Sequence, residues 1–149
     1  MAHRIAERQV EHDRVVYASA SLLQGKFEDR RVTVNPDRRQ SMQIGCEGKP
    51  CYPDVVVWQP ESTSSLRGSV EVICEVETAD STTEEESAQW KEYGKIPVTF
   101  CLVVPREKER VAVWIVKKNS VHLSQLWTYV IAGDNVYFEE RDLLPVRGV

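Results

Sequence analysis

Two short apolar segments of this chain carry carboxylates that a buried strand does not ordinarily accommodate. Val55–Trp58 contains no polar residue and directly follows Asp54, so it predicts a strand buried on both faces. Residues 69–77 alternate with a period of two, which places Glu75 and Glu77 on one face, about 6.5–7 Å apart at Cα. An ionised carboxylate in an apolar strand costs several kcal/mol unless it is paired, solvated or metal-bound. Three such acids on neighbouring strands predict a cation site.

The pattern around these strands predicts an α/β chain forming one domain over residues 1–149. Residues 4–23 read as an amphipathic helix, with His12 and Val16 on its apolar face and Gly25 as its stop. A second helix is predicted to start with the acids at 84–86 and to end at Gly94. Further strands are predicted at 31–34, 42–44, 98–104 and 111–116, with a loop at 45–50, a charged turn at 106–110, a short helix at 120–126 and a hairpin at 127–138.

Composition and charge limit the classes of function. No apolar run approaches the roughly 20 residues that a membrane-spanning helix needs, and residues 1–14 lack a signal-peptide apolar region. We therefore expect a cytoplasmic protein with no membrane partner. The net charge of −4 matches phosphate backbones poorly, so a nucleic-acid role must rest on a local basic patch, a metal or a partner.

The four cysteines do not indicate a metal centre. Cys74 and Cys101 lie in apolar strand patterns and are expected in the core. Cys46 and Cys51 have the spacing of half a zinc site, but no second Cys/His pair with ligand spacing follows. A disulfide is not expected in a reducing compartment.

Three motifs follow one another along the chain: Pro53-Asp54, Glu75-Val76-Glu77 and Gln89-x-x-x-Tyr93. In this order, on apolar strands and a following helix, they resemble the PD-(D/E)XK nuclease superfamily, and the Gln-x-x-x-Tyr resembles its RecB-type branch. The resemblance covers roughly residues 5–105. It implies a restriction-endonuclease-like fold, with a central mixed β-sheet flanked by helices (an αβββαβ core), here followed by a C-terminal β extension.

The resemblance also implies an activity and a site. The activity would be metal-dependent endonucleolytic hydrolysis of phosphodiester bonds in DNA, with magnesium or manganese as the cofactor. Asp54, Glu75 and the backbone carbonyl of Val76 would hold the metal. Gln89 and Tyr93 would face the site and help to hold the substrate or the metal-bound water. Glu11, or alternatively Glu7, would be the additional acid that some members carry on the first helix.

The sequence departs from the family pattern at Glu77, where the family usually has lysine. A third carboxylate can bind a second metal or accept a proton from the attacking water, but it cannot stabilise a phosphorane as a lysine does. A second hypothesis is therefore a catalytically inactive nuclease-fold module for binding or oligomerisation, with a homodimer left open. A third is a small α/β domain of unrelated function.

Overall fold

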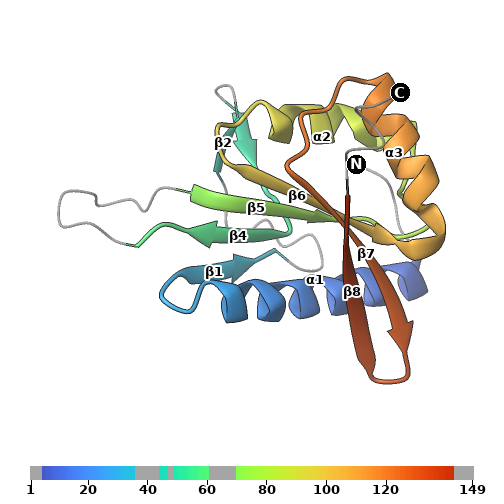
Figure 1. Ribbon diagram of the computed structural model, residues 1–149, viewed down its shortest axis with the longest axis horizontal. Helices are drawn as coiled ribbons and strands as arrows, with labels where there is room; N and C mark the ends of the chain where they lie inside the picture. The colour runs from blue at the N-terminus through green and yellow to red at the C-terminus, as the bar shows by residue number, and fades with distance from the viewer. Residues whose placement is uncertain (1–4, 36–43, 47–48, 61–69, 143–149) are drawn as a thin grey trace.

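A computed structural model describes residues 5–35, 44–46, 49–60 and 70–142, and in them the chain has a mixed α/β fold with a curled six-stranded sheet (Figure 1). The helices are α1 (Ala6–Lys26), α2 (Ser87–Gly94) and α3 (Glu109–Lys118). The sheet strands, in spatial order, are β1 (Arg31–Val34), β4 (Val55–Trp58), β5 (Val70–Val76), β6 (Thr99–Pro105), β7 (Gln125–Ala132) and β8 (Asn135–Arg141). A separate hairpin is formed by β2 (Ile44–Cys46) and β3 (Lys49–Cys51).

The sheet changes from antiparallel to parallel at β5. Strands β1, β4 and β5 pair antiparallel, whereas β6 runs parallel to β5, and β7 runs parallel to β6. Parallel neighbours need a crossover connection, and α2 and α3 provide the two that this sheet requires. The predicted strands at 31–34, 55–58, 69–77 and 98–104 and the late hairpin are confirmed, and β8 closes the sheet antiparallel to β7.

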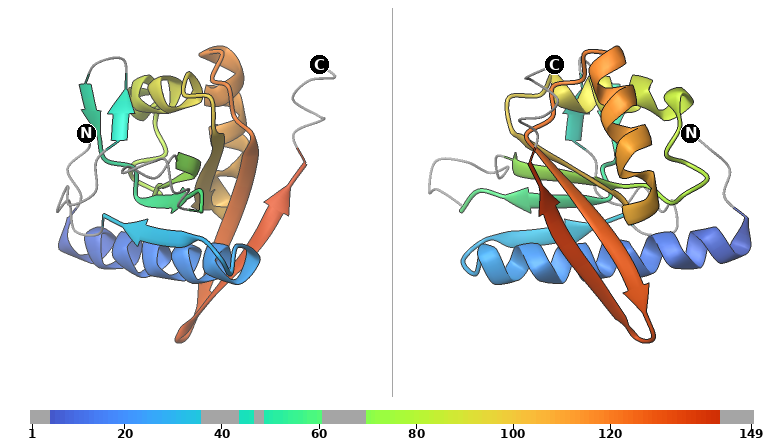
Figure 2. Two further views of the ribbon diagram at one scale, coloured as in Figure 1. Left: turned by 90° about the vertical axis from the view of Figure 1, so that its left-hand side faces the viewer. Right: turned by 45° about the vertical axis from the view of Figure 1, so that its right-hand side comes forward.

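Helices cover both faces of the sheet, as both views in Figure 2 show. On one face, Val15 and Val16 of α1 pack against strand residues that include Val55 and Cys74. On the other face, the α2 and α3 side chains pack with Ile73 and its neighbours on the sheet. The alternation predicted along β5 therefore holds at its centre, since Ile73 and Cys74 belong to opposite cores.

The alternation fails at the start of β5 because the β4–β5 pairing contains a bulge. Val57 pairs with Val72 but Trp58 pairs with Val70, so Glu71 is the extra residue. Val70 consequently packs on the Ile73 side, and the expectation that it shares a face with Val72 was wrong.

The segment between β6 and β7 was predicted incorrectly. The turn at 106–110 and the strand at 111–116 are instead a short 3-10 turn (Arg106–Lys108) followed by α3. Residues 120–126 form no helix but lead directly into β7, which begins at Gln125. Ala112, Ile115 and Val116 are the buried side chains of α3, and their helical spacing places them together against the sheet.

Smaller differences concern turns and cysteines. Helix α1 runs through Gly25 to Lys26, so Gly25 is not its stop. The predicted loop at 45–50 contains the β2–β3 pairing, and of the strand predicted at 42–44 only Ile44 is described. Cys74 and Cys101 are buried free thiols, as predicted, whereas Cys51 is disulfide-bonded, which was not expected. None of the helices in the described residues is long and apolar enough to cross a membrane.

Candidate functional site

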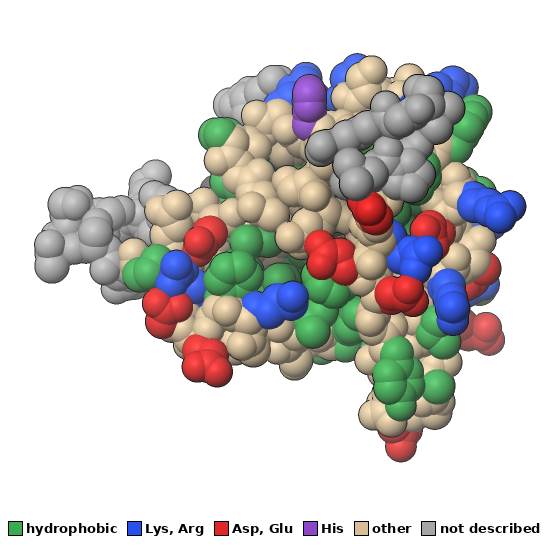
Figure 3. Space-filling view, in the orientation of Figure 1, with side chains coloured by type: hydrophobic (Ala, Val, Ile, Leu, Met, Phe, Trp, Pro, Cys, Tyr) green, Lys and Arg blue, Asp and Glu red, His purple; other side chains and the backbone are tan. Residues whose placement is uncertain are grey.

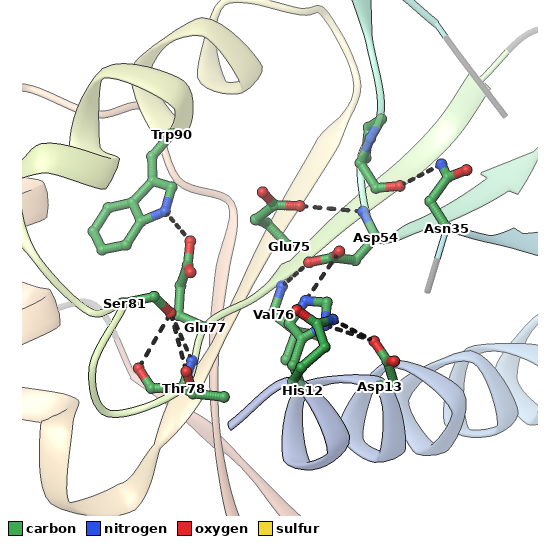
Figure 4. A network of polar contacts seen from close by, with 12 residues as sticks. His12, Asp13, Asn35, Asp54, Glu75, Val76, Glu77, Thr78, Ser81 and Trp90 are labelled. Atoms are coloured by element: carbon green, nitrogen blue, oxygen red, sulfur yellow. Dashed lines mark hydrogen bonds and ion pairs between the residues drawn. The ribbon is translucent and has the colours of Figure 1, made fainter. Parts of the chain in front are cut away.

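Asp54 and Glu75 meet at the point where β4 begins and β5 approaches its end. Val55 pairs with Cys74, so Asp54, one residue earlier, lies beside Glu75, one residue later. The backbone amide of Asp54 donates to Glu75 Oε1 at 3.1 Å, and the amide of Val76 donates to Asp54 Oδ2 at 2.8 Å (Figure 4). Both side chains are buried, with 9% and 7% of the residue exposed. The structure therefore brings together the two acids that the sequence assigned to a cation.

This pair is electrostatically unfavourable without a counter-charge. Burial, and next the charges of Asp54 and Glu77, raise the pKa of Glu75 well above its usual value of 4.5. A proton on one of the two buried carboxylates, or a cation near both, would relieve this cost.

Tyr93 of α2 lies at the same site. Its hydroxyl is buried and has no hydrogen-bond partner in the described part of the chain. Burial raises the pKa of Tyr93, and the charges of Glu75 and Asp54 raise it further, which reflects how close these groups are. Its ring packs edge-on against Phe100, with centroids 5.7 Å apart. A buried hydroxyl donor without a partner beside two acids is suited to bind a ligand oxygen.

Glu77 belongs to the same acidic group but is held by a tryptophan. It is 1% exposed, and its Oε2 accepts a hydrogen bond of 2.7 Å from Nε1 of Trp90 on α2. Its backbone amide donates to Val103 O at 2.8 Å, which extends the pairing of β5 with β6. Trp90 was not predicted as a site residue, because the sequence pattern only showed it as an apolar residue on a helix.

His12 of α1 is the second site residue that the sequence analysis missed. Its Nε2 lies 3.1 Å from Asp54 Oδ1, and its Nδ1 lies 3.0 Å from Asp13 Oδ1. The imidazole is 3% exposed. The available signal was its position on the apolar face of the predicted helix, where a polar side chain needs a buried partner.

The remaining predicted residues lie differently. Glu11 accepts hydrogen bonds from Tyr129 Oη at 2.6 Å and Arg8 at 2.9 Å, so on α1 it is His12, and not Glu11, that contacts Asp54. Gln89 is half-buried on α2, and its side chain makes no hydrogen bond to the other site residues within the described part of the chain. Buried Asn35, the residue after β1, supports the site, because its side chain donates to Pro53 O at 2.8 Å and its backbone amide donates to Asp54 O at 2.9 Å.

The described residues contain no group of three or more His, Cys, Asp and Glu side chains arranged to hold a metal ion. Asp54 and Glu75 are the two carboxylates that lie together there, and magnesium needs only one or two carboxylates from a protein because it keeps several waters.

Comparison with known proteins adds no assignment, since no family model, curated protein or solved structure matches the chain. Fold and site define a mixed α/β protein with a buried pair of carboxylates at the junction of β4, β5 and α1.

Proposed function

We propose that this protein is a divalent-metal-dependent nuclease of restriction-endonuclease-like fold that hydrolyses phosphodiester bonds in DNA. The order of elements supports the proposal. In chain order, α1 is followed by β1, the separate β2–β3 hairpin, β4 and β5, then by α2 and the parallel strand β6, and β1, β4 and β5 pair antiparallel. With the β2–β3 hairpin taken as an insertion, this order is compatible with the αβββαβ core that the motif resemblance implies, and α3 with β7 and β8 would form a C-terminal extension.

The observation that carries the proposal is the contact between Asp54 and Glu75. Their carboxylates, with the carbonyl of Val76, would hold magnesium or manganese, whose preferred ligands are oxygens. A bound ion would supply a hydroxide at neutral pH and counter-charge for the phosphate. A bound cation would also relieve the repulsion by Asp54 and Glu77 that, after burial, raises the pKa of Glu75.

The neighbouring side chains would position substrate and water. The Tyr93 hydroxyl, which finds no partner among the described residues, would bind a phosphate oxygen or the attacking water. Glu77 would orient that water or accept its proton, with Trp90 holding its carboxyl group in place. Gln89 would assist from the same helix. The hydrogen bond that Tyr129 Oη donates to Glu11 favours a structural role for this acid over the role of additional site acid predicted for it.

A second candidate is a nuclease-fold protein without catalysis, acting as a binding or oligomerisation module. It is favoured by Glu77 in place of lysine, and by the protein donors already present at both oxygens of Asp54. On the face drawn in Figure 3, the acidic and basic side chains of the described residues are interspersed instead of gathered by sign. A protein with such a surface has no broad electrostatic attraction for DNA on that face.

Manganese titration by calorimetry on wild type and Asp54→Asn, followed by plasmid nicking with both, tests the proposal. Asparagine keeps an acceptor for the Val76 amide but removes the charge, so we expect affinity to fall about 10-fold or more and nicking to be lost. Manganese binding by wild type without nicking would favour the second candidate. Absence of manganese binding by wild type would refute the metal site.

A further inference from the structure

The imidazole of His12 lies between two carboxylates that come from different parts of the fold. Asp54 Oδ1 approaches Nε2 at 3.1 Å from the start of β4, and Asp13 Oδ1 approaches Nδ1 at 3.0 Å from α1 itself (Figure 4). Because the ring is 3% exposed, these contacts replace water at its two nitrogens. The ring therefore connects Asp13 to a carboxylate of the candidate site.

The contact between His12 and Asp13 is not a default of helix geometry. Adjacent helical side chains point in directions about 100° apart and do not face each other. Here Gln9, one turn earlier, donates from Nε2 to Asp13 Oδ1 at 2.9 Å. This bond holds the Asp13 carboxylate beside the imidazole, where it selects one of the two ring orientations that a histidine can adopt.

The consequence for Asp54 is that each of its oxygens is fixed by a separate element. The Val76 amide of β5 holds Oδ2 at 2.8 Å, and His12 of α1 holds Oδ1. A carboxylate held at both oxygens loses its freedom to rotate, so its remaining lone pairs stay directed beside Glu75. Such outer hydrogen bonds orient ligands and strengthen metal binding.

We propose that Asp13 and His12 are positioning residues of the candidate site: Asp13 fixes the imidazole of His12, and His12 fixes the carboxylate of Asp54. Both ring nitrogens of His12 face carboxylate oxygens, so we assign His12 to holding Asp54 and not to the metal. The effect on metal affinity rests on the proposed function, whereas the orientation of the ring does not.

Calorimetric manganese titration of a set of variants tests this chain of contacts. Asp13→Ala is expected to weaken binding about 10- to 100-fold. The control Glu28→Ala removes an exposed carboxylate without a role in the site and should change affinity less than about 2-fold. His12→Gln keeps an N–H near the position of Nε2, so it should retain more affinity than His12→Ala. In the His12→Ala background, Asp13→Ala should have no further effect, because it acts through the ring.

Three results would overturn the proposal. Equal loss in His12→Gln and His12→Ala would mean that the ring nitrogen is itself a ligand. An undiminished effect of Asp13→Ala in the His12→Ala background would mean that Asp13 acts by another route. Indistinguishable affinities of Asp13→Ala and Glu28→Ala would mean that the contact has no consequence. Thermal unfolding of each variant in the absence of metal separates these results from misfolding.

A spectroscopic measurement distinguishes failure of this inference from failure of the proposed function. In metal-free wild type, the imidazole 1H–15N spectrum should contain an observable Nδ1–H of His12, and Asp13→Ala should lose it. If wild type binds no manganese, the nuclease proposal fails while this spectrum still decides the role of Asp13. A spectrum unchanged by Asp13→Ala overturns the positioning role.

Discussion

Replacing Trp90 by phenylalanine tests how firmly the fold holds Glu77. The substitution removes the indole N–H that donates to Glu77 Oε2 at 2.7 Å, in a place where Trp90 is 0% and Glu77 1% exposed. A hydrogen bond to a charged group contributes about 1.5–3 kcal/mol. The change also removes two ring carbons, worth about 1.6 kcal/mol at roughly 0.8 kcal/mol for each buried carbon. We therefore expect the free energy of unfolding to fall by about 4 kcal/mol.

Urea denaturation followed by tryptophan fluorescence and circular dichroism measures this loss. The matched control is Trp114→Phe on α3, where the side chain is exposed and its ring lies under Lys118 Nζ at 4.7 Å. An exposed cation–π contact contributes about 0.5–1 kcal/mol, so the control should lose about 1 kcal/mol or less. A Trp90→Phe variant that loses no more than the control would refute the inference that Glu77 depends on this bond.

Two further predictions concern charge and packing. The raised pKa of Glu75 means that the folded state binds its proton more tightly than the unfolded state, so wild type loses stability as pH rises from the usual value of 4.5 through the folded pKa. In urea denaturation, the free energy of unfolding of Glu75→Gln should equal that of wild type near pH 4 and exceed it at pH 8. A Glu75→Gln variant that is less stable than wild type at pH 8 would contradict this. A Cβ on Gly94 would lie 2.6 Å from the His122 carbonyl oxygen, whereas one on Gly25 of α1 would meet nothing within 4 Å. Gly94→Ala should therefore cost about 1–3 kcal/mol and Gly25→Ala should stabilise by up to about 1 kcal/mol in thermal unfolding, and equal effects would refute the steric argument.

The sequence predicted those elements whose apolar pattern has only one interpretation. The alternating segment of β5 is such a case, and Val55–Trp58 is another because Pro53 and Pro60 leave too little room there for a helix. The run from Val111 to Val116 is different, because six consecutive apolar residues fit a strand or a buried helix equally. It forms a helix because β6 and β7 pair parallel, and parallel neighbours need a crossover connection, which is usually a helix. This pairing joins strands that are distant in sequence, so the local residue pattern does not indicate it.

The candidate site was predictable only in the part that its two strands determine. Asp54 and Glu75 could be paired from the sequence, because adjacent strands bring their ends together and their charges are conspicuous in apolar surroundings. The contacts of His12 and Trp90 could not, because they depend on how α1 and α2 dock on the sheet. A histidine on the apolar face of a helix indicates that a partner exists but not which one.

The double anchoring of Asp54 couples α1 to the hairpin of β4 and β5. If α1 left the sheet, the buried Asp54 carboxylate would lose its contact with His12. We therefore expect α1, β4 and β5 to open to solvent as one cooperative unit in amide hydrogen exchange. A ligand bound to Asp54 and Glu75 would then slow amide exchange along all 21 residues of α1, which is about 30 Å long at 1.5 Å per residue. Slower exchange would be measurable even at Lys26, far from where the ligand binds.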